Sequence, residues 1–146
     1  MRYVYPVKLE QDKNGLYVAT VRDVPEALID AETVGEALLE MGEALGVALA
    51  GYSKEGRDLP RPSVAKRHEF LVPVAPLVAA KLALRSAMRE KAITNVALAQ
   101  LLNVSEGVVR RLIDPDHASR LDGIVAALVA IGHGLIIEDQ KMQCGA

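Results

Sequence analysis

A short segment near residue 110 carries side chains that could bind DNA. Arginine donates paired hydrogen bonds to guanine edges and to phosphates, and the chain has two arginines in succession, Arg110 and Arg111. Serine and glutamate can also contact bases, and Ser105 and Glu106 lie about one helical turn earlier. A helix that begins at Ser105 would present the following residues away from the core: Ser105, Glu106, Gly107, Arg110 and Arg111. The segment therefore predicts a recognition helix whose first turn enters the major groove.

Residues 94–113 have the pattern of a helix-turn-helix, which would hold that recognition helix in place. Two short helices that cross around a tight turn need a small residue at their contact, and Ala99 meets this need. Four positions later the turn needs left-handed backbone, which Asn103 tolerates better than most residues. Thr94 and Ser105 can cap the two helices. The expected core of the motif is Leu98, Leu102, Val104, Val109 and Leu112.

Further candidate DNA contacts flank this motif. Thr94 and Asn95 begin its first helix, while His117 and Arg120 stand near the start of a later helix that Ser119 would cap. For His117, an ordinary polar loop position is the alternative. The plainer interpretation of the whole region is a helical hairpin with solvated arginines. The combined placement of the contact residue and the turn residue favours DNA binding.

Three aspartates, Asp12, Asp23 and Asp30, are candidates for a nuclease that binds two metal ions. Each stands in a turn or at a predicted strand end, where aspartate is commonly solvated or capping, and their spacing does not force them together. The single cysteine, Cys144, is expected to be a free thiol. The histidines suggest no nucleophile arrangement: His68, His117 and His133. We therefore expect no enzymatic activity, no metal and no cofactor.

The first half of the chain predicts a small αβ module. Apolar and polar residues alternate on both sides of Asn14-Gly15, which indicates two strands joined by a turn. Pro6 lacks an N–H group, so a free edge or a bulge is expected there. Thr33 and Glu36 form a capping box at the start of the clearest helix. The predicted elements are strands over 3–9, 16–22 and 27–31, a helix from 34 to Gly51, an extended stretch over 56–63 and a strand over 68–74.

After a linker near Pro76, the pattern is helical. We expect two domains, a partner-binding module over residues 1–75 and an all-α DNA-binding module over residues 77–140. In the first helix of the second module, Lys81 lies off the apolar face. Residues 134–138 resemble a short strand that could pair with a second copy of the chain, or fold back on their own helices. Homodimerisation would suit binding to palindromic half-sites.

Charge is distributed unevenly along the chain. The formal net charge is −2, made up of −3 before Pro76 and +1 after it, so DNA binding would need a local basic patch. The acidic helix face formed by Glu36, Glu40 and Glu43 could attract a basic partner protein, although such residues often serve only solubility. No leader and no apolar run of about 20 residues is visible, which predicts a cytoplasmic protein without membrane contact.

Several short motifs follow one another in a definite order. In the first half they are Tyr5-Pro6-Val7, Asp12 with Gly15, Asp23-Val24-Pro25, Thr33 to Leu38, and Leu59 to Ser63. In the second half they are the helix-turn-helix, Asp114 to His117, and Ala127 to Gly132. In this order they resemble the HicB-type antitoxins of bacterial toxin–antitoxin operons, with a Cro/repressor-type helix-turn-helix. One departure is Glu26-Ala27 after Pro25, where such antitoxins commonly carry Gly-Cys or a similar pair.

The resemblance implies a β-β-β-α-β, partial RNase H-like module without a nuclease site, followed by an all-α domain, which makes an α+β protein. It also implies that the first module masks a HicA-like toxin, a small RNA-cleaving protein, and that the second binds the promoter of its own operon as a homodimer or higher oligomer. The alternative is a stand-alone transcriptional regulator whose first module senses a ligand or another partner.

Overall fold

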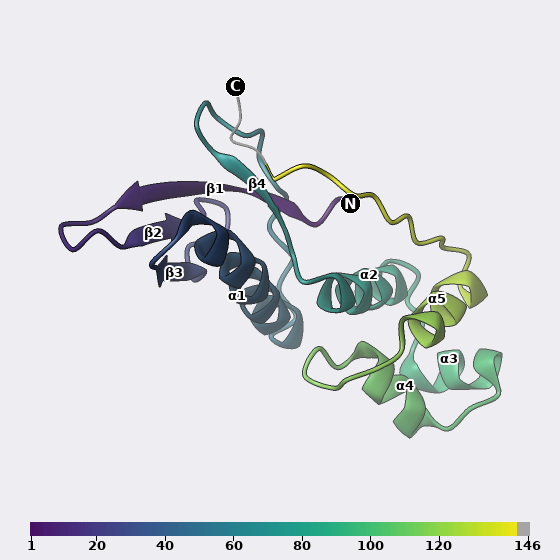
Figure 1. Cartoon of the computed structure of the whole chain (residues 1–146). Helices are drawn as coiled ribbons and strands as arrows, with labels where there is room; N and C mark the ends of the chain where they lie inside the picture. The colour runs from purple at the N-terminus through teal and green to yellow at the C-terminus, as the bar shows by residue number, and fades with distance from the viewer. Residues whose placement is uncertain (143–146) are drawn as a thin grey trace. The chain divides into compact units, whose positions relative to one another are not determined.

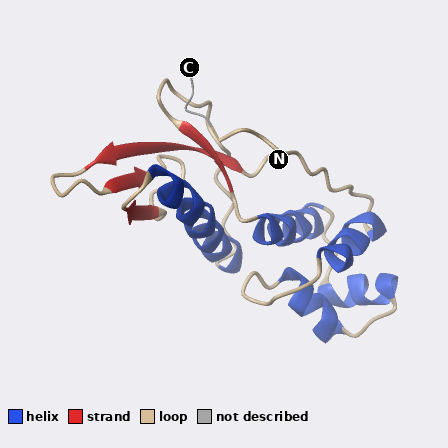
Figure 2. Cartoon of the chain, in the orientation of Figure 1, coloured by secondary structure: helices blue, strands red, loops and turns tan. Residues whose placement is uncertain are grey.

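The computed structural model describes residues 1–142, which form two compact units (Figure 1). The first unit contains residues 1–76 and the described residues from Asp139 onward, and the second contains residues 77–138. A β-sheet and one long helix build the first unit, whereas the second contains helices and loops (Figure 2). The predicted α+β class is confirmed.

Four antiparallel strands form the sheet of the first unit, in the order β3-β2-β1-β4. They are β1 (Val4–Gln11), β2 (Tyr17–Thr20), β3 (Leu28–Ala31) and β4 (Phe70–Pro73). Strand β1 pairs with β4 through its first half and with β2 through its second half, so Pro6 has a paired strand on one side only. Because proline cannot donate a ladder hydrogen bond, this half-free position suits it, as predicted.

Helix α1 (Val34–Lys54) packs against the sheet through an apolar face. Its start is capped as predicted, since the Thr33 hydroxyl accepts a hydrogen bond of 3.2 Å from the Glu36 N–H. The predicted end at Gly51 is wrong: the helix continues for a further turn and ends before Gly56, which has a φ of 71°. Gly51 keeps right-handed backbone, so it does not break the helix. Neither α1 nor any other described helix is long and apolar enough to cross a membrane.

Close packing joins α1 to strand β4. A Cβ atom placed on Gly42 would lie 2.9 Å from the Pro73 carbonyl oxygen, so this position requires glycine. The Gly42 carbonyl also accepts a hydrogen bond of 3.1 Å from the Ala75 N–H. The fully or nearly buried side chains around this contact include Tyr5, Val7, Met41, Leu45, Leu49 and Val72.

The connection from α1 to β4 lies along the sheet and is held by side chains of β1 and of the loop after β2. The Tyr5 hydroxyl donates to the Pro60 carbonyl at 2.6 Å. The Asp23 carboxylate accepts hydrogen bonds of 2.9 Å from both the N–H and the hydroxyl of Ser63. The predicted extended stretch over residues 56–63 therefore has defined partners, and Asp23 is occupied in holding it.

A partly buried ion pair anchors the last part of this connection. Arg22 pairs with Glu69, whose other carboxylate oxygen accepts a hydrogen bond of 2.6 Å from the Lys66 N–H. Burial raises the pKa of the Glu69 carboxyl, but the hydrogen bonds and charges of Arg22 and Lys66 outweigh burial and hold that pKa below its usual value. The prediction that His68 begins a strand is wrong, because His68 has a φ of 68° in a turn and the strand begins at Phe70.

The second unit contains four helices around one apolar core. They are α2 (Pro76–Glu90), which begins at the boundary of the units, α3 (Asn95–Leu102), α4 (Glu106–Ile113) and α5 (Leu121–Ala130). The fully buried core side chains are Leu84, Leu98, Val109, Ile124 and Ala127. Leu102 and Leu112 pack against this core as predicted.

Two expectations for the second unit are wrong. Val104 is 39% exposed and does not belong to the core, because it follows the left-handed Asn103 and projects from the turn. Residues 134–138 form no strand in the structure. Their own unit consists of helices and loops and so offers them no strand with which to pair, and Ile136 and Ile137 are 89% and 77% exposed.

Candidate nucleic-acid interface

The turn between α3 and α4 has the local structure that the sequence predicts. The Thr94 hydroxyl caps α3 by accepting a hydrogen bond of 3.1 Å from the Ala97 N–H. Asn103 ends α3 in left-handed backbone, with φ 54° and ψ 47°. The Ser105 hydroxyl then caps α4 by accepting a hydrogen bond of 3.4 Å from the Val108 N–H. The two helices are thus separate and joined by a short turn.

The contact between α3 and α4 is close and apolar. Ala99 is buried, and Leu98 and Val109 beside it are fully buried. The Ala99 carbonyl also accepts a hydrogen bond of 3.0 Å from the Val104 N–H, which closes the turn. A small side chain at this position lets the helices approach, as the sequence predicts.

The predicted recognition face of α4 is exposed. Ser105, Glu106, Arg110 and Arg111 are exposed, and Gly107 is half-buried. Neither arginine side chain makes an ion pair or a hydrogen bond within residues 1–142. Both guanidinium groups therefore keep their donors for an external acceptor. The negative charge of Glu106 in the first turn of α4 interacts favourably with the helix dipole.

The remaining predicted contact residues differ in how available they are. At the start of α3, Thr94 is exposed although its hydroxyl serves as a cap, and Asn95 is half-buried. In the loop before α5, His117 is exposed. The Arg120 guanidinium lies 3.8 Å from the Asp122 carboxylate, with both side chains largely exposed, so this pair is weak and could open for a stronger anion.

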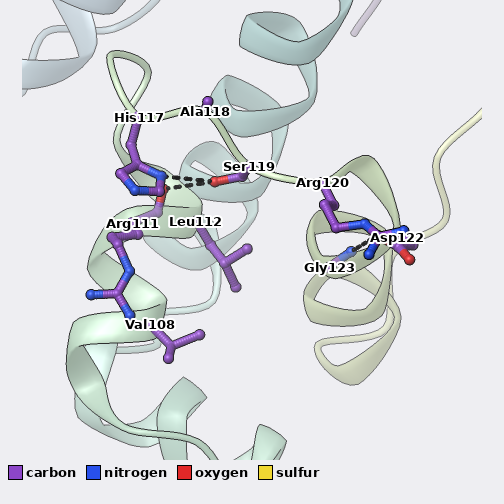
Figure 3. A pocket seen from close by; sticks show the side chains of 9 residues that line it. All are labelled: Val108, Arg111, Leu112, His117, Ala118, Ser119, Arg120, Asp122 and Gly123. Atoms are coloured by element: carbon purple, nitrogen blue, oxygen red, sulfur yellow. Dashed lines mark hydrogen bonds and ion pairs between the residues drawn. The ribbon is translucent and has the colours of Figure 1, made fainter.

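An open hollow of about 440 Å³ brings α4 together with the loop that follows it (Figure 3). Arg111 and His117 lie on one side, and Arg120 lies across from them at the start of α5. Ser119 does not cap α5 as predicted, because α5 begins without a side-chain cap. Its hydroxyl instead lies 3.4 Å from His117 Nδ1 and donates to the Arg111 carbonyl at 3.3 Å. The arginine and histidine side chains predicted from distant positions thus line one hollow.

The sequence places Lys81 off the apolar face of α2, but in the structure it is buried. Its side chain is 1% exposed, and its ammonium group is surrounded by acceptors from α4 and the α4–α5 loop. Burial lowers the pKa of Lys81, while the Asp114 carboxylate raises it. A signal for this role exists in Pro115, which cannot supply the N–H that a helix carbonyl four residues earlier would need.

One predicted acidic face of the first unit lies on helix α1. Glu36, Glu40 and Glu43 are all exposed on α1, so this predicted acidic face is available to a partner. The exposed apolar side chains of Leu39 and Val47 lie on the same helix. This face therefore presents both negative charge and apolar side chains to solvent.

The three candidate nuclease aspartates do not gather into one cluster within residues 1–142. The Asp12 carboxylate accepts hydrogen bonds of 2.8 and 2.9 Å from the Asn14 and Leu16 N–H groups in its own turn. No group of three His, Cys, Asp or Glu side chains that could hold a metal occurs among residues 1–142. Cys144 lies outside the described residues.

The departure at Glu26-Ala27 has a structural explanation. The Glu26 carboxylate accepts hydrogen bonds of 2.9 and 3.0 Å from the Tyr52 hydroxyl near the end of α1, and Ala27 is buried. The Arg57 guanidinium lies over the Tyr52 ring, 3.9 Å from its centroid. Glu26 therefore links the loop before β3 to the end of α1.

The comparisons with known proteins all identify the same family. The model of the family described as "HicB_like antitoxin of bacterial toxin-antitoxin system" matches residues 4–83, just over half of the chain. Antitoxin HicB 2 of Photorhabdus laumondii subsp. laumondii is 35% identical over 131 residues, which cover 90% of this chain and 92% of that protein. Antitoxin HicB of Escherichia coli (strain K12) is 33% identical over 131 residues, covering 90% of this chain and 95% of that protein.

Proposed function

Because this chain belongs to the HicB antitoxin family, we propose that it neutralises a HicA-like, mRNA-cleaving toxin by direct binding and represses its own operon by binding operator DNA. The first unit would cover the toxin, and the second would bind the DNA. Both proposed partners are cytoplasmic, so the same location is proposed for this protein. The family is one of antitoxins, not enzymes.

The observation that carries DNA binding is the exposed face of α4. Its first turn is capped and exposed, and Arg110 and Arg111 have no partner within the described chain. In a helix-turn-helix the second helix lies in the major groove with its N-terminal residues on base edges. Arg110 and Arg111 would bind guanine edges or phosphates, and His117 and Arg120 would bind the phosphate backbone.

Toxin binding is proposed for the acidic face of α1. A protein that cleaves RNA needs basic surface, which complementary charge on Glu36, Glu40 and Glu43 would attract. Replacing these three residues with lysine is expected to weaken binding of the toxin encoded beside this gene at least about tenfold, chiefly through the association rate. Surface plasmon resonance at two salt concentrations measures the change.

The matched control reverses three exposed acids elsewhere, Glu10, Asp30 and Glu90, and should leave toxin affinity within about threefold. Equal losses from both triple variants would show that net charge alone matters and would remove α1 from the interface. A neighbouring gene product that does not copurify with this protein, or an unrelated enzyme in the neighbouring reading frame, would favour the alternative function of a stand-alone regulator.

Homodimerisation is proposed for residues 134–138, although they do not form the predicted strand. Ile136 and Ile137 are highly exposed, and burying apolar side chains between two copies would be favourable. Replacing both with serine is expected to shift a dimer to a monomer in sedimentation equilibrium. Val64→Ser, at an equally exposed apolar residue of the first unit, should leave the mass unchanged. A dimer that persists in the double variant would place the interface elsewhere.

A further inference from the structure

The ammonium group of Lys81 has four acceptor oxygens within hydrogen-bond distance of its three N–H groups. Its Nζ atom donates to the carbonyl oxygens of Arg111 and Asp114 at 2.8 Å each and of His117 at 2.6 Å. It also lies 2.8 Å from the Ser119 hydroxyl oxygen. Every acceptor belongs to the end of α4 or to the loop that follows it, whereas Lys81 stands on α2. The buried ammonium group of Lys81 therefore holds the loop after α4 against the core of the second unit.

The sequence after α4 explains why a donor is needed there. In a helix the Arg111 carbonyl would accept from the N–H of residue 115, but that residue is Pro115 and has none. Asp114 leaves the helix with extended backbone, and its carbonyl accepts one backbone hydrogen bond, of 3.1 Å from the His117 N–H, so Lys81 is its second donor. An unpaired buried carbonyl is unfavourable, and a lysine with three donors can satisfy several at once.

The loop held by Lys81 carries His117 and Arg120, two residues of the proposed DNA interface. Arg111, His117 and Arg120 line the open hollow between α4 and the start of α5 (Figure 3). The Ser119 hydroxyl, which Lys81 holds, also contacts His117 Nδ1 and the Arg111 carbonyl. The path of the loop, and with it the spacing of these side chains from α4, thus depends on Lys81.

We propose that Lys81 is a positioning residue for DNA binding, which orients the loop residues His117 and Arg120 toward the phosphate backbone without touching DNA itself. Its burial excludes direct contact with a phosphate. The proposal rests on the proposed function of the second unit. It adds that the loop side of the DNA interface is held in place by a buried ammonium group on α2, and not by α3 or α4 alone.

The test measures binding of the full-length protein to a duplex from the region upstream of its operon. Lys81→Met keeps an unbranched side chain, one atom shorter, and removes the charge. It should weaken binding about tenfold or more while lowering the salt slope by about one, as expected for the loss of the charged phosphate contact of Arg120. The matched control is Lys91→Met. Lys91 also donates to a helix-end carbonyl, that of Ile131, but lies away from the loop, so DNA binding should change less than about threefold.

A double-mutant cycle separates positioning from general damage. In a background of His117→Ala and Arg120→Ala, Lys81→Met should cost little further affinity, because the residues it orients are already gone. An undiminished loss in that background would overturn the proposal. Ser119→Ala provides a milder variant if Lys81→Met does not fold, and it should cause a smaller loss with the same reduction in salt slope.

Two further results would distinguish failure of the proposed function from failure of this inference. Wild-type protein that does not bind the upstream duplex would defeat the proposed function, and the inference with it. Wild-type protein that binds, together with a folded Lys81→Met variant of unchanged affinity and salt slope, would defeat the inference alone.

Discussion

Replacing Arg110 and Arg111 together with alanine is expected to abolish retention of the upstream operon DNA, with affinity falling at least about 100-fold. Both side chains are exposed on α4 and have no partner in the described chain, so their removal leaves the fold intact. Each guanidinium can contribute paired hydrogen bonds that water replaces poorly, and each phosphate contact releases a counterion. Electrophoretic retardation across a salt titration measures both effects.

The matched control for that experiment is the double variant Arg61→Ala and Arg67→Ala, which removes two exposed arginines from the first unit. It should bind the same duplex with affinity and salt slope close to wild type. Toxin capture by the Arg110/Arg111 variant should also be normal, because the proposed toxin surface lies on α1. Unchanged DNA affinity and an unchanged salt slope in that variant would remove α4 from the interface.

Ala99→Leu is expected to destabilise the second unit by about 1–3 kcal/mol and to eliminate DNA binding. Ala99 is buried where α3 meets α4, next to the fully buried Leu98 and Val109. Three additional carbon atoms would force these helices apart, so α4 would no longer present its recognition face at the angle the groove requires. Urea denaturation measures the stability, and DNA retardation measures the binding.

The control for this prediction is Ala126→Leu, the same chemical change at an exposed position of α5. Its free energy of unfolding should stay within about 0.5 kcal/mol of wild type. If Ala99→Leu were as stable as this control and still bound DNA, the crossing of α3 and α4 would tolerate a large side chain. The idea that Ala99 sets the geometry of the site would then fail.

Features governed by neighbouring residues were predictable from the sequence. Thr33, Thr94 and Ser105 each cap a helix through the N–H three residues later, and Asn103 adopts the left-handed turn. Such interactions depend on local chemistry, and the period of apolar residues indicates which helix faces are buried. The α+β order and the exposed arginines of α4 followed from the same local patterns.

Gly51 and residues 134–138 show where local pattern was insufficient. Glycine ends a helix only where the chain takes up left-handed backbone, and here Gly56, not Gly51, does so. An apolar run at 134–138 forms a strand only if another strand lies beside it, and the second unit contributes none within the described chain. Both outcomes depend on what the rest of the chain places nearby.

The sequence by itself determined the helix caps, the turn between α3 and α4 and the residues of the α4 face, because each of these depends on residues a few positions apart. Only the tertiary structure decided that Lys81 is buried and that Ser119 is its acceptor and not a cap. A lysine is normally solvated, and its burial here requires carbonyl oxygens that come from 30 to 36 residues away in the chain. Pro115 indicates locally that the Arg111 carbonyl lacks a helical donor, but not which side chain supplies one, since the acceptors meet only when α2, α4 and the following loop pack together.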